Sequence, residues 1–129
     1  MTVFYLALAG ALGALVRWGI SRLAVDLWGP GFPLGTLIVN LSGCFFLGLI
    51  MELGEQGSWI SPELRMVIGV GFIGALTTFS TFAFETLRLS RRGGWLLAGA
   101  NMTLNLVLGL ALVWLGARLG SAALALRKG

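Results

Sequence analysis

The sequence predicts an all-α membrane protein with four transmembrane helices in one domain, residues 1–129. The chain is 57% hydrophobic and only 11% charged, and its mean hydropathy of +0.93 lies outside the range of ordinary soluble domains. Four stretches without a charged residue are near or above the length of a spanning helix, and they are 1–16, 27–51, 66–84 and 93–117. With flanking residues added, we expect helices at about 3–25, 33–53, 62–89 and 94–120.

The first span carries Arg17 before the helix has run its expected length. This side chain either snorkels to the lipid headgroups or faces an aqueous vestibule, where it would attract anions. The turn at 29–33, which is rich in glycine and proline, then ends the span and leads into the next one.

The second span begins at about Pro33, which suits a first helical turn because its missing N–H would be unpaired there. Asn40 is the buried polar residue of this span. An amide this deep in an apolar helix needs partners, and two roles are open: it joins helices by hydrogen bonds, or it donates to a solute from a pore wall. The lone Cys44 is expected to be a small packing residue.

The third span contains the least helix-favouring stretch of the chain, GVGFIGALTTFSTFAFE at 69–85. Glycines are followed there by hydroxyl residues, so we expect a break near Gly74–Thr78. Carbonyl groups freed by a break need protein, water or an ion as partners within a bilayer. The alternative is a kinked core helix that packs small residues against a neighbour. Ser61 and Pro62 are expected to form the N-cap and the first residue of this span.

The fourth span carries Asn101 and Asn105, which are four residues apart and therefore form one polar line along a helix. Further along, Gly116 and Gly120 form a close-packing motif, which lets another helix approach the backbone. This span therefore combines a polar line with a close-packing surface.

The side-chain inventory argues against an enzyme. The sequence has no His and one Cys, and it lacks clustered carboxylates and a basic partner placed to activate a hydroxyl nucleophile. Transition-metal and phosphate-loop signatures are absent as well. The net charge is +4, but the basic residues stand at helix ends and in loops, as is typical of interfacial anchors and not of a nucleic-acid surface. We therefore expect neither catalysis nor nucleic-acid binding.

Neutral polar side chains are concentrated in the predicted membrane interior. They are Asn40, Thr78, Ser80, Thr81, Asn101 and Asn105. Phe79 and Phe82 stand among them, and they share one face of a helix because they are three residues apart. Amide and hydroxyl hydrogens, together with the positive edge of an aromatic ring, suit a small dehydrated anion. The sequence thus favours a pore for such an anion.

Four short helices scarcely enclose a pore, so we expect a homodimer. With four spans, the nine basic residues divide almost evenly between the two sides of the membrane. One side has Arg65, Arg118, Arg127 and Lys128, and the other has Arg17, Arg22, Arg88, Arg91 and Arg92. The chain therefore has no strong preferred orientation, which fits insertion both ways round and an antiparallel dual-topology homodimer in the lipid bilayer.

Three motifs, in this order, closely resemble the Fluc (CrcB) family of bacterial fluoride channels. They are GALVRW at 13–18, FPLGTLIVNLSG at 32–43 and GFIGALTTFSTFAFE at 71–85. The resemblance covers nearly the whole chain and implies a passive channel that exports fluoride across the bacterial cytoplasmic (inner) membrane. It also implies an antiparallel dimer of four-helix subunits with two fluoride pores.

The same resemblance implies roles for particular residues. Phe79 and Phe82 match the phenylalanines that line the pores, Asn40 matches the pore asparagine, and Arg17 matches the vestibule arginine. At Asn101 and Asn105 the chain departs from the family, which usually has Tyr and Ser on this polar track.

A structural sodium ion on the dimer axis is also implied. The carbonyl groups of Gly74 and Thr77 match those that hold this ion in the family. The expected break supports it, because a two-fold axis would double two free carbonyl groups to about four oxygen ligands.

Two alternatives remain open. A small dual-topology multidrug or guanidinium exporter has a similar size and number of spans, but it needs a membrane-embedded carboxylate to exchange protons for a cation, and the first span has none. The other alternative is a structural membrane subunit without a transport role. The hydroxyl-rich third span argues against it.

Overall fold

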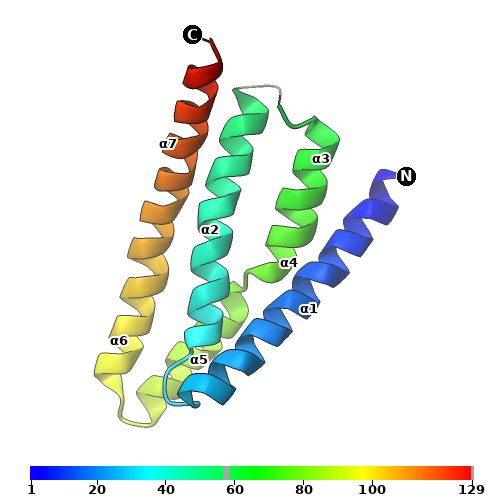
Figure 1. Ribbon diagram of the computed structural model, residues 1–129. Helices are drawn as coiled ribbons and strands as arrows, with labels where there is room; N and C mark the ends of the chain where they lie inside the picture. The colour runs from blue at the N-terminus through cyan, green and yellow to red at the C-terminus, as the bar shows by residue number, and fades with distance from the viewer. Residues whose placement is uncertain (57–58, 129) are drawn as a thin grey trace.

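The computed structural model describes residues 1–56 and 59–128, and these residues form helices joined by short connections (Figure 1). With η marking a π-helical segment, the order is α1 (Thr2–Trp28), α2 (Leu34–Glu55), α3 (Pro62–Met66), η1 (Val67–Ile73), α4 (Gly74–Leu76), α5 (Phe79–Arg91), α6 (Trp95–Thr103), η2 (Leu104–Leu108) and α7 (Gly109–Lys128). The described residues contain no strand. The prediction of an all-α protein is confirmed.

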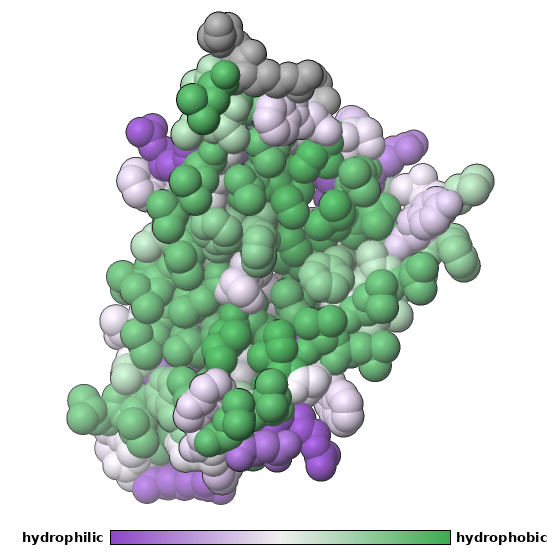
Figure 2. All heavy atoms as spheres, in the orientation of Figure 1, coloured by the Kyte–Doolittle hydropathy of each residue, from purple (hydrophilic) through white to green (hydrophobic). Residues whose placement is uncertain are grey.

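Four helical stretches are long and apolar enough to cross a membrane, as the sequence predicts. They are Thr2–Trp28, Leu34–Glu55, Pro62–Arg91 and Trp95–Leu126. Both termini lie at one end of the molecule, and the α1–α2 and α5–α6 connections lie at the opposite end (Figure 1). On the face that Figure 2 shows, hydrophobic residues cover most of the middle, and hydrophilic residues gather toward the two ends. The chain is therefore built as a multi-pass membrane protein.

Helices α2 and α7 pack backbone against backbone along the predicted close-packing surface. A Cβ atom at Gly116 would collide with the carbonyl oxygen of Phe45, and a Cβ atom at Gly48 would collide with that of Val113. Gly120 is buried on the same surface. The packing role predicted for Gly116 and Gly120 is confirmed.

The third and fourth spans each contain a π-helical segment that the sequence analysis did not predict. Segment η1 lies against α1, where the carbonyl oxygen of Phe72 occupies the space that a side chain at Gly13 would need. Segment η2 lies within the fourth span and contains Asn105. This span continues to Lys128, past the predicted end near residue 120, because Gly120 packs against α2 inside the helix and does not end it.

Thr77 and Thr78 leave the helical conformation between α4 and α5. Their backbones are extended, with φ −81° and ψ 156° at Thr77 and φ −153° and ψ 115° at Thr78. The Thr78 hydroxyl accepts a hydrogen bond from the backbone N–H of Thr81 at 3.2 Å, so Thr78 is the N-cap of α5. Ser61 caps α3 in the same way by accepting from the N–H of Leu64 at 3.2 Å, which confirms the predicted start of the third span.

Candidate functional site

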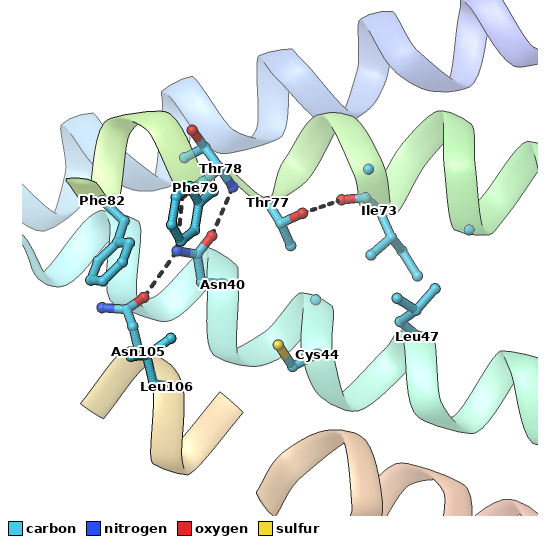
Figure 3. Close-up of a pocket in the computed structure, with 13 residues that line it drawn as sticks. Asn40, Cys44, Leu47, Ile73, Thr77, Thr78, Phe79, Phe82, Asn105 and Leu106 are labelled. Atoms are coloured by element: carbon cyan, nitrogen blue, oxygen red, sulfur yellow. Dashed lines mark hydrogen bonds between the residues drawn. The ribbon is translucent and has the colours of Figure 1, made fainter. Parts of the chain in front are cut away.

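Most of the predicted site residues come together from α2, the α4–α5 break and η2 (Figure 3). They line a cavity of about 270 Å³. Its lining consists of Asn40, Gly43, Cys44, Leu47, Gly69, Ile73, Gly74, Thr77, Thr78, Phe79, Phe82, Asn105 and Leu106. None of these side chains carries a charge, so the cavity offers neutral polar groups among apolar ones.

Asn40 forms hydrogen bonds to both backbone polar groups of Thr78 at the break, and it supplies the acceptor that the Thr78 N–H loses there. Its Oδ1 atom accepts from the N–H of Thr78 at 2.8 Å, and its Nδ2 atom donates to the Thr78 carbonyl oxygen at 3.2 Å. One side-chain amide thus pairs with both polar backbone groups of one residue, as a neighbouring strand would. Unpaired polar groups are costly in a bilayer, so Asn40 stabilises the extended conformation of Thr78 and joins α2 to the third span.

A line of hydrogen bonds runs from Asn40 through the fourth span to α5. Asn40 Nδ2 donates to Asn105 Oδ1 at 2.9 Å (Figure 3), and Asn105 Nδ2 donates to Asn101 Oδ1 at 3.0 Å. Asn101 Nδ2 donates to Thr86 Oγ1 at 2.8 Å, and Thr86 Oγ1 donates to the carbonyl oxygen of Phe82 at 2.8 Å. We call this series the amide line.

The rings of Phe79 and Phe82 lie against each other where two cavities meet. Their centroids are 5.5 Å apart and their planes are tilted by 59°. Phe82 is 6% exposed, whereas Phe79 is 74% exposed. Both rings also line a second cavity of about 680 Å³, which lies among residues of α5, α6 and η2. The two rings therefore separate a partly polar cavity from a more apolar one.

The remaining predicted residues lie outside the lining of the first cavity. Ser80 and Thr81 are exposed, and their hydroxyl groups lie 3.4 Å and 3.0 Å from the Thr78 Oγ1 atom. Asn101 is fully buried, one hydrogen bond away from the lining. Arg17 is half-buried on α1 and does not line this cavity.

Several residues of the site were missed by the sequence analysis. Gly43, Cys44 and Leu47 line the first cavity. They follow Asn40 at intervals that place them on one face of a helix, and this spacing could have found them. Thr86, which connects Asn101 to Phe82 in the amide line, could not be found in this way, because its role depends on contact with another span.

Another polar group lies close to the junction of α1 and α2. Glu85 lies close to Thr36 and Arg88, in a cavity of about 250 Å³ that Ser21 also lines. Its Oε2 atom is buried, with no partner among the described residues. Glu85 is on the same helix as Phe82, but it lines neither of the cavities beside the phenylalanine rings.

Two backbone carbonyl groups at the break have lost their usual helical donors. In a continuous helix the Gly74 carbonyl would accept from the N–H of Thr78, and the Thr77 carbonyl would accept from the N–H of Thr81. The first of these N–H groups donates to Asn40 and the second to the Thr78 hydroxyl. The described part of the chain has no group of three His, Cys, Asp or Glu side chains that could bind a metal ion.

These features define a multi-pass helical membrane protein with a neutral, amide-lined cavity beside an interrupted span. The sequence family described as CrcB-like protein, Camphor Resistance (CrcB), matches residues 4–117. The chain belongs to this CrcB family.

Three similar proteins bear the name fluoride-specific ion channel FluC. The protein from Shewanella amazonensis (strain ATCC BAA-1098 / SB2B) is 53% identical over 117 residues, which cover 91% of this chain and 94% of the relative. The proteins from Shewanella sp. (strain W3-18-1) and Shewanella loihica (strain ATCC BAA-1088 / PV-4) are 52% and 49% identical, with the same coverage of 91% and 94%.

Proposed function

We propose that the chain is the subunit of a fluoride-selective passive channel, which exports cytoplasmic fluoride down its gradient across the bacterial cytoplasmic (inner) membrane. The observation that carries this proposal is the position of Phe79 and Phe82, which stand between two uncharged cavities beside the amide line. Membership of the CrcB family and the name shared by the relatives support it.

An uncharged lining suits the rapid passage of a small anion. The positive edges of aromatic rings and the hydrogens of amides and hydroxyls replace part of the hydration shell of fluoride. Among the described residues, no lysine or arginine lines either cavity, so no fixed opposite charge there holds the ion back. The described lining of the two cavities contains no carboxylate either, and a proton-coupled exporter would need one on its path.

A second copy of the chain would complete the pore. Gly74, Ser80 and Thr81 are exposed within the third span, and lipid can offer the two hydroxyl groups no hydrogen bond beyond those that they share with Thr78. Phe79 is exposed on the same segment. A two-fold related subunit would cover this segment, and each dimer would then contain two pores.

The even division of basic residues between the two ends favours an antiparallel dimer. Because the preference for either orientation is close to zero, reporter fusions at the C-terminus are expected to be active on both faces of the membrane. Added lysines in one connection should bias insertion toward one orientation. A single fixed orientation of the unmodified chain would contradict the antiparallel arrangement.

The dimer axis would also hold a structural sodium ion at the carbonyl groups of Gly74 and Thr77. The helical donors of these two carbonyl groups bond elsewhere, and a two-fold axis would supply about four oxygen ligands to a hard monovalent cation. Prolonged exchange into sodium-free buffer should lower the melting temperature of the dimer, and restored sodium should reverse the change. An unaltered melting temperature and unaltered flux would remove the ion from the proposal.

Fluoride efflux from reconstituted liposomes tests the channel function directly. Phe79→Ile and Phe82→Ile remove the positive ring edge but keep an apolar side chain, and we expect each to lower efflux by about tenfold or more. Asn40→Asp should also lower efflux, because it places a negative charge on the path of an anion.

Phe84→Ile is the matched control. Phe84 is 64% exposed on the same helix, and two residues of helix turn it to the side opposite Phe82. Each variant should elute as a dimer from a size-exclusion column. If both Phe79→Ile and Phe82→Ile conducted as well as Phe84→Ile, the rings would be packing residues and the proposed path would be wrong.

A further inference from the structure

The amide line has a fixed donor direction, and its hydrogens are fully used at Asn40 and Asn105. Asn40 Nδ2 places its two hydrogens on the Thr78 carbonyl oxygen and on Asn105 Oδ1, at 3.2 Å and 2.9 Å. Asn105 Nδ2 places its two hydrogens on the carbonyl oxygen and the Oδ1 atom of Asn101, both at 3.0 Å. Asn105 therefore has no hydrogen left for an anion, and it directs an oxygen at Asn40.

Asn101 holds the Asn105 side chain in this orientation. Asn101 is 0% exposed, and it is anchored in turn by its 2.8 Å bond to Thr86 on α5. A hydroxyl group can rotate to donate or accept, but an amide exchanges its donor and acceptor ends only by a half turn. Such a turn at Asn105 would break both bonds to Asn101, so the Asn105 oxygen stays directed at Asn40.

We propose that Asn105 is a positioning residue that controls how tightly the pore holds its anion. While the pore is empty, its Oδ1 atom accepts a hydrogen bond from Asn40 Nδ2. When an anion arrives, the same Nδ2 hydrogen bonds to the anion instead. This inference rests on the proposed channel function and deepens it. Asn40 Nδ2 also donates to the Thr78 carbonyl oxygen, but we expect that hydrogen bond to stay in place, because it is one of the two bonds that pair Asn40 with Thr78. Asn40 and Asn105 share a single hydrogen bond, which is easier to exchange.

The exchange makes anion binding weaker and anion release faster. A buried N–H without a partner costs free energy, and the Asn105 oxygen removes that cost from the empty pore. The anion therefore gains only the difference between two hydrogen bonds. When an apolar side chain replaces Asn105, the Asn40 hydrogen has no protein acceptor on this side until an anion arrives, so the anion should bind more tightly and leave more slowly.

The test is the dependence of fluoride efflux on fluoride concentration in liposomes. Asn105→Leu and Asn105→Met carry apolar side chains of similar bulk, and we expect both to lower the half-saturating fluoride concentration by about three- to tenfold, the contribution of one hydrogen bond. Maximal flux should fall as well. A merely structural role would lower maximal flux and leave half-saturation unchanged, so the two parameters together separate the explanations.

Val107→Ala is the control, because Val107 is 58% exposed on the same π segment and lines neither cavity. It should match the wild type in both parameters. Calorimetric titration of the detergent-solubilised dimer with sodium fluoride gives a second measure of affinity that does not depend on flux.

The outcomes separate this inference from the channel function. Unchanged or raised half-saturation in both folded Asn105 variants, with a conducting wild type, overturns the role of Asn105 and leaves the channel function standing. A wild type that shows no fluoride efflux overturns the channel function, and this inference falls with it. If one variant fails to elute as a dimer, the other decides.

Discussion

Helix α2 meets two of its neighbours in opposite ways. On the side facing α7, Gly48 of α2 and Gly116 of α7 have no side chain, so the two main chains are in direct contact. Toward the α4–α5 break it offers the amide of Asn40, which pairs with Thr78 beside a cavity of about 270 Å³. The first contact excludes everything but protein, whereas the second leaves room for an ion. One helix thus serves as rigid support on one side and as the wall of a path on the other.

The largest effect on stability is expected from a substitution in the glycine-packed contact between α2 and α7. Gly116→Ala places a methyl group on the carbonyl oxygen of Phe45, and because a helix backbone cannot move aside easily, we expect a loss of about 3 kcal/mol in the free energy of unfolding. Denaturant titration of the purified protein in detergent measures this loss.

Gly19→Ala is the matched control for this substitution. Among the described residues, no atom beyond the adjacent residues and backbone of its own helix lies within 4 Å of the position where its Cβ would stand, so the same chemical change should instead stabilise helix α1 by roughly 0.5–1 kcal/mol. Equal effects of the two substitutions would show that backbone contact does not hold α2 and α7 together.

A smaller effect is expected on the polar side of α2. Thr78→Val keeps the shape of the side chain but removes the hydroxyl that caps α5, and we expect a loss of about 1 kcal/mol. Ser42→Ala is the control, because the partners of the Ser42 hydroxyl among the described residues are carbonyl groups of its own helix. Denaturant titration of both variants gives the comparison, and a Thr78→Val protein as stable as Ser42→Ala would leave the cap without a measurable role.

The fold could be predicted from the sequence because lipid restricts what can cross a membrane. Charge-free runs of the right length predicted the four spans, and the Gly116 and Gly120 spacing predicted a close helix contact. Helical periodicity also placed Asn101 and Asn105 on one line, and the structure joins them by a hydrogen bond at 3.0 Å. Each of these predictions rests on residues close together in the sequence or on the requirements of the lipid bilayer.

The rest depends on contacts between distant parts of the chain. The pairing of Asn40 with Thr78 joins residues 38 positions apart, and its bond to Asn105 joins residues 65 positions apart. No periodicity reports such pairs. The π segments were missed for a similar reason, since the hydrophobic pattern does not distinguish them from α-helix. The placement of Arg17 outside the first cavity likewise depends on how α1 crosses the other spans.

Asn40 precedes in the chain the residues that it stabilises, and this order bears on assembly during synthesis. The chain is made from its N-terminus, so α2 is inserted before the extended residues Thr77 and Thr78. Its amide is already present when the interrupted span enters the bilayer, so the Thr78 N–H has an acceptor as soon as it leaves water. Asn105 arrives last and completes the line. A chain with the second and third spans exchanged would have to insert the interruption before its partner had been made.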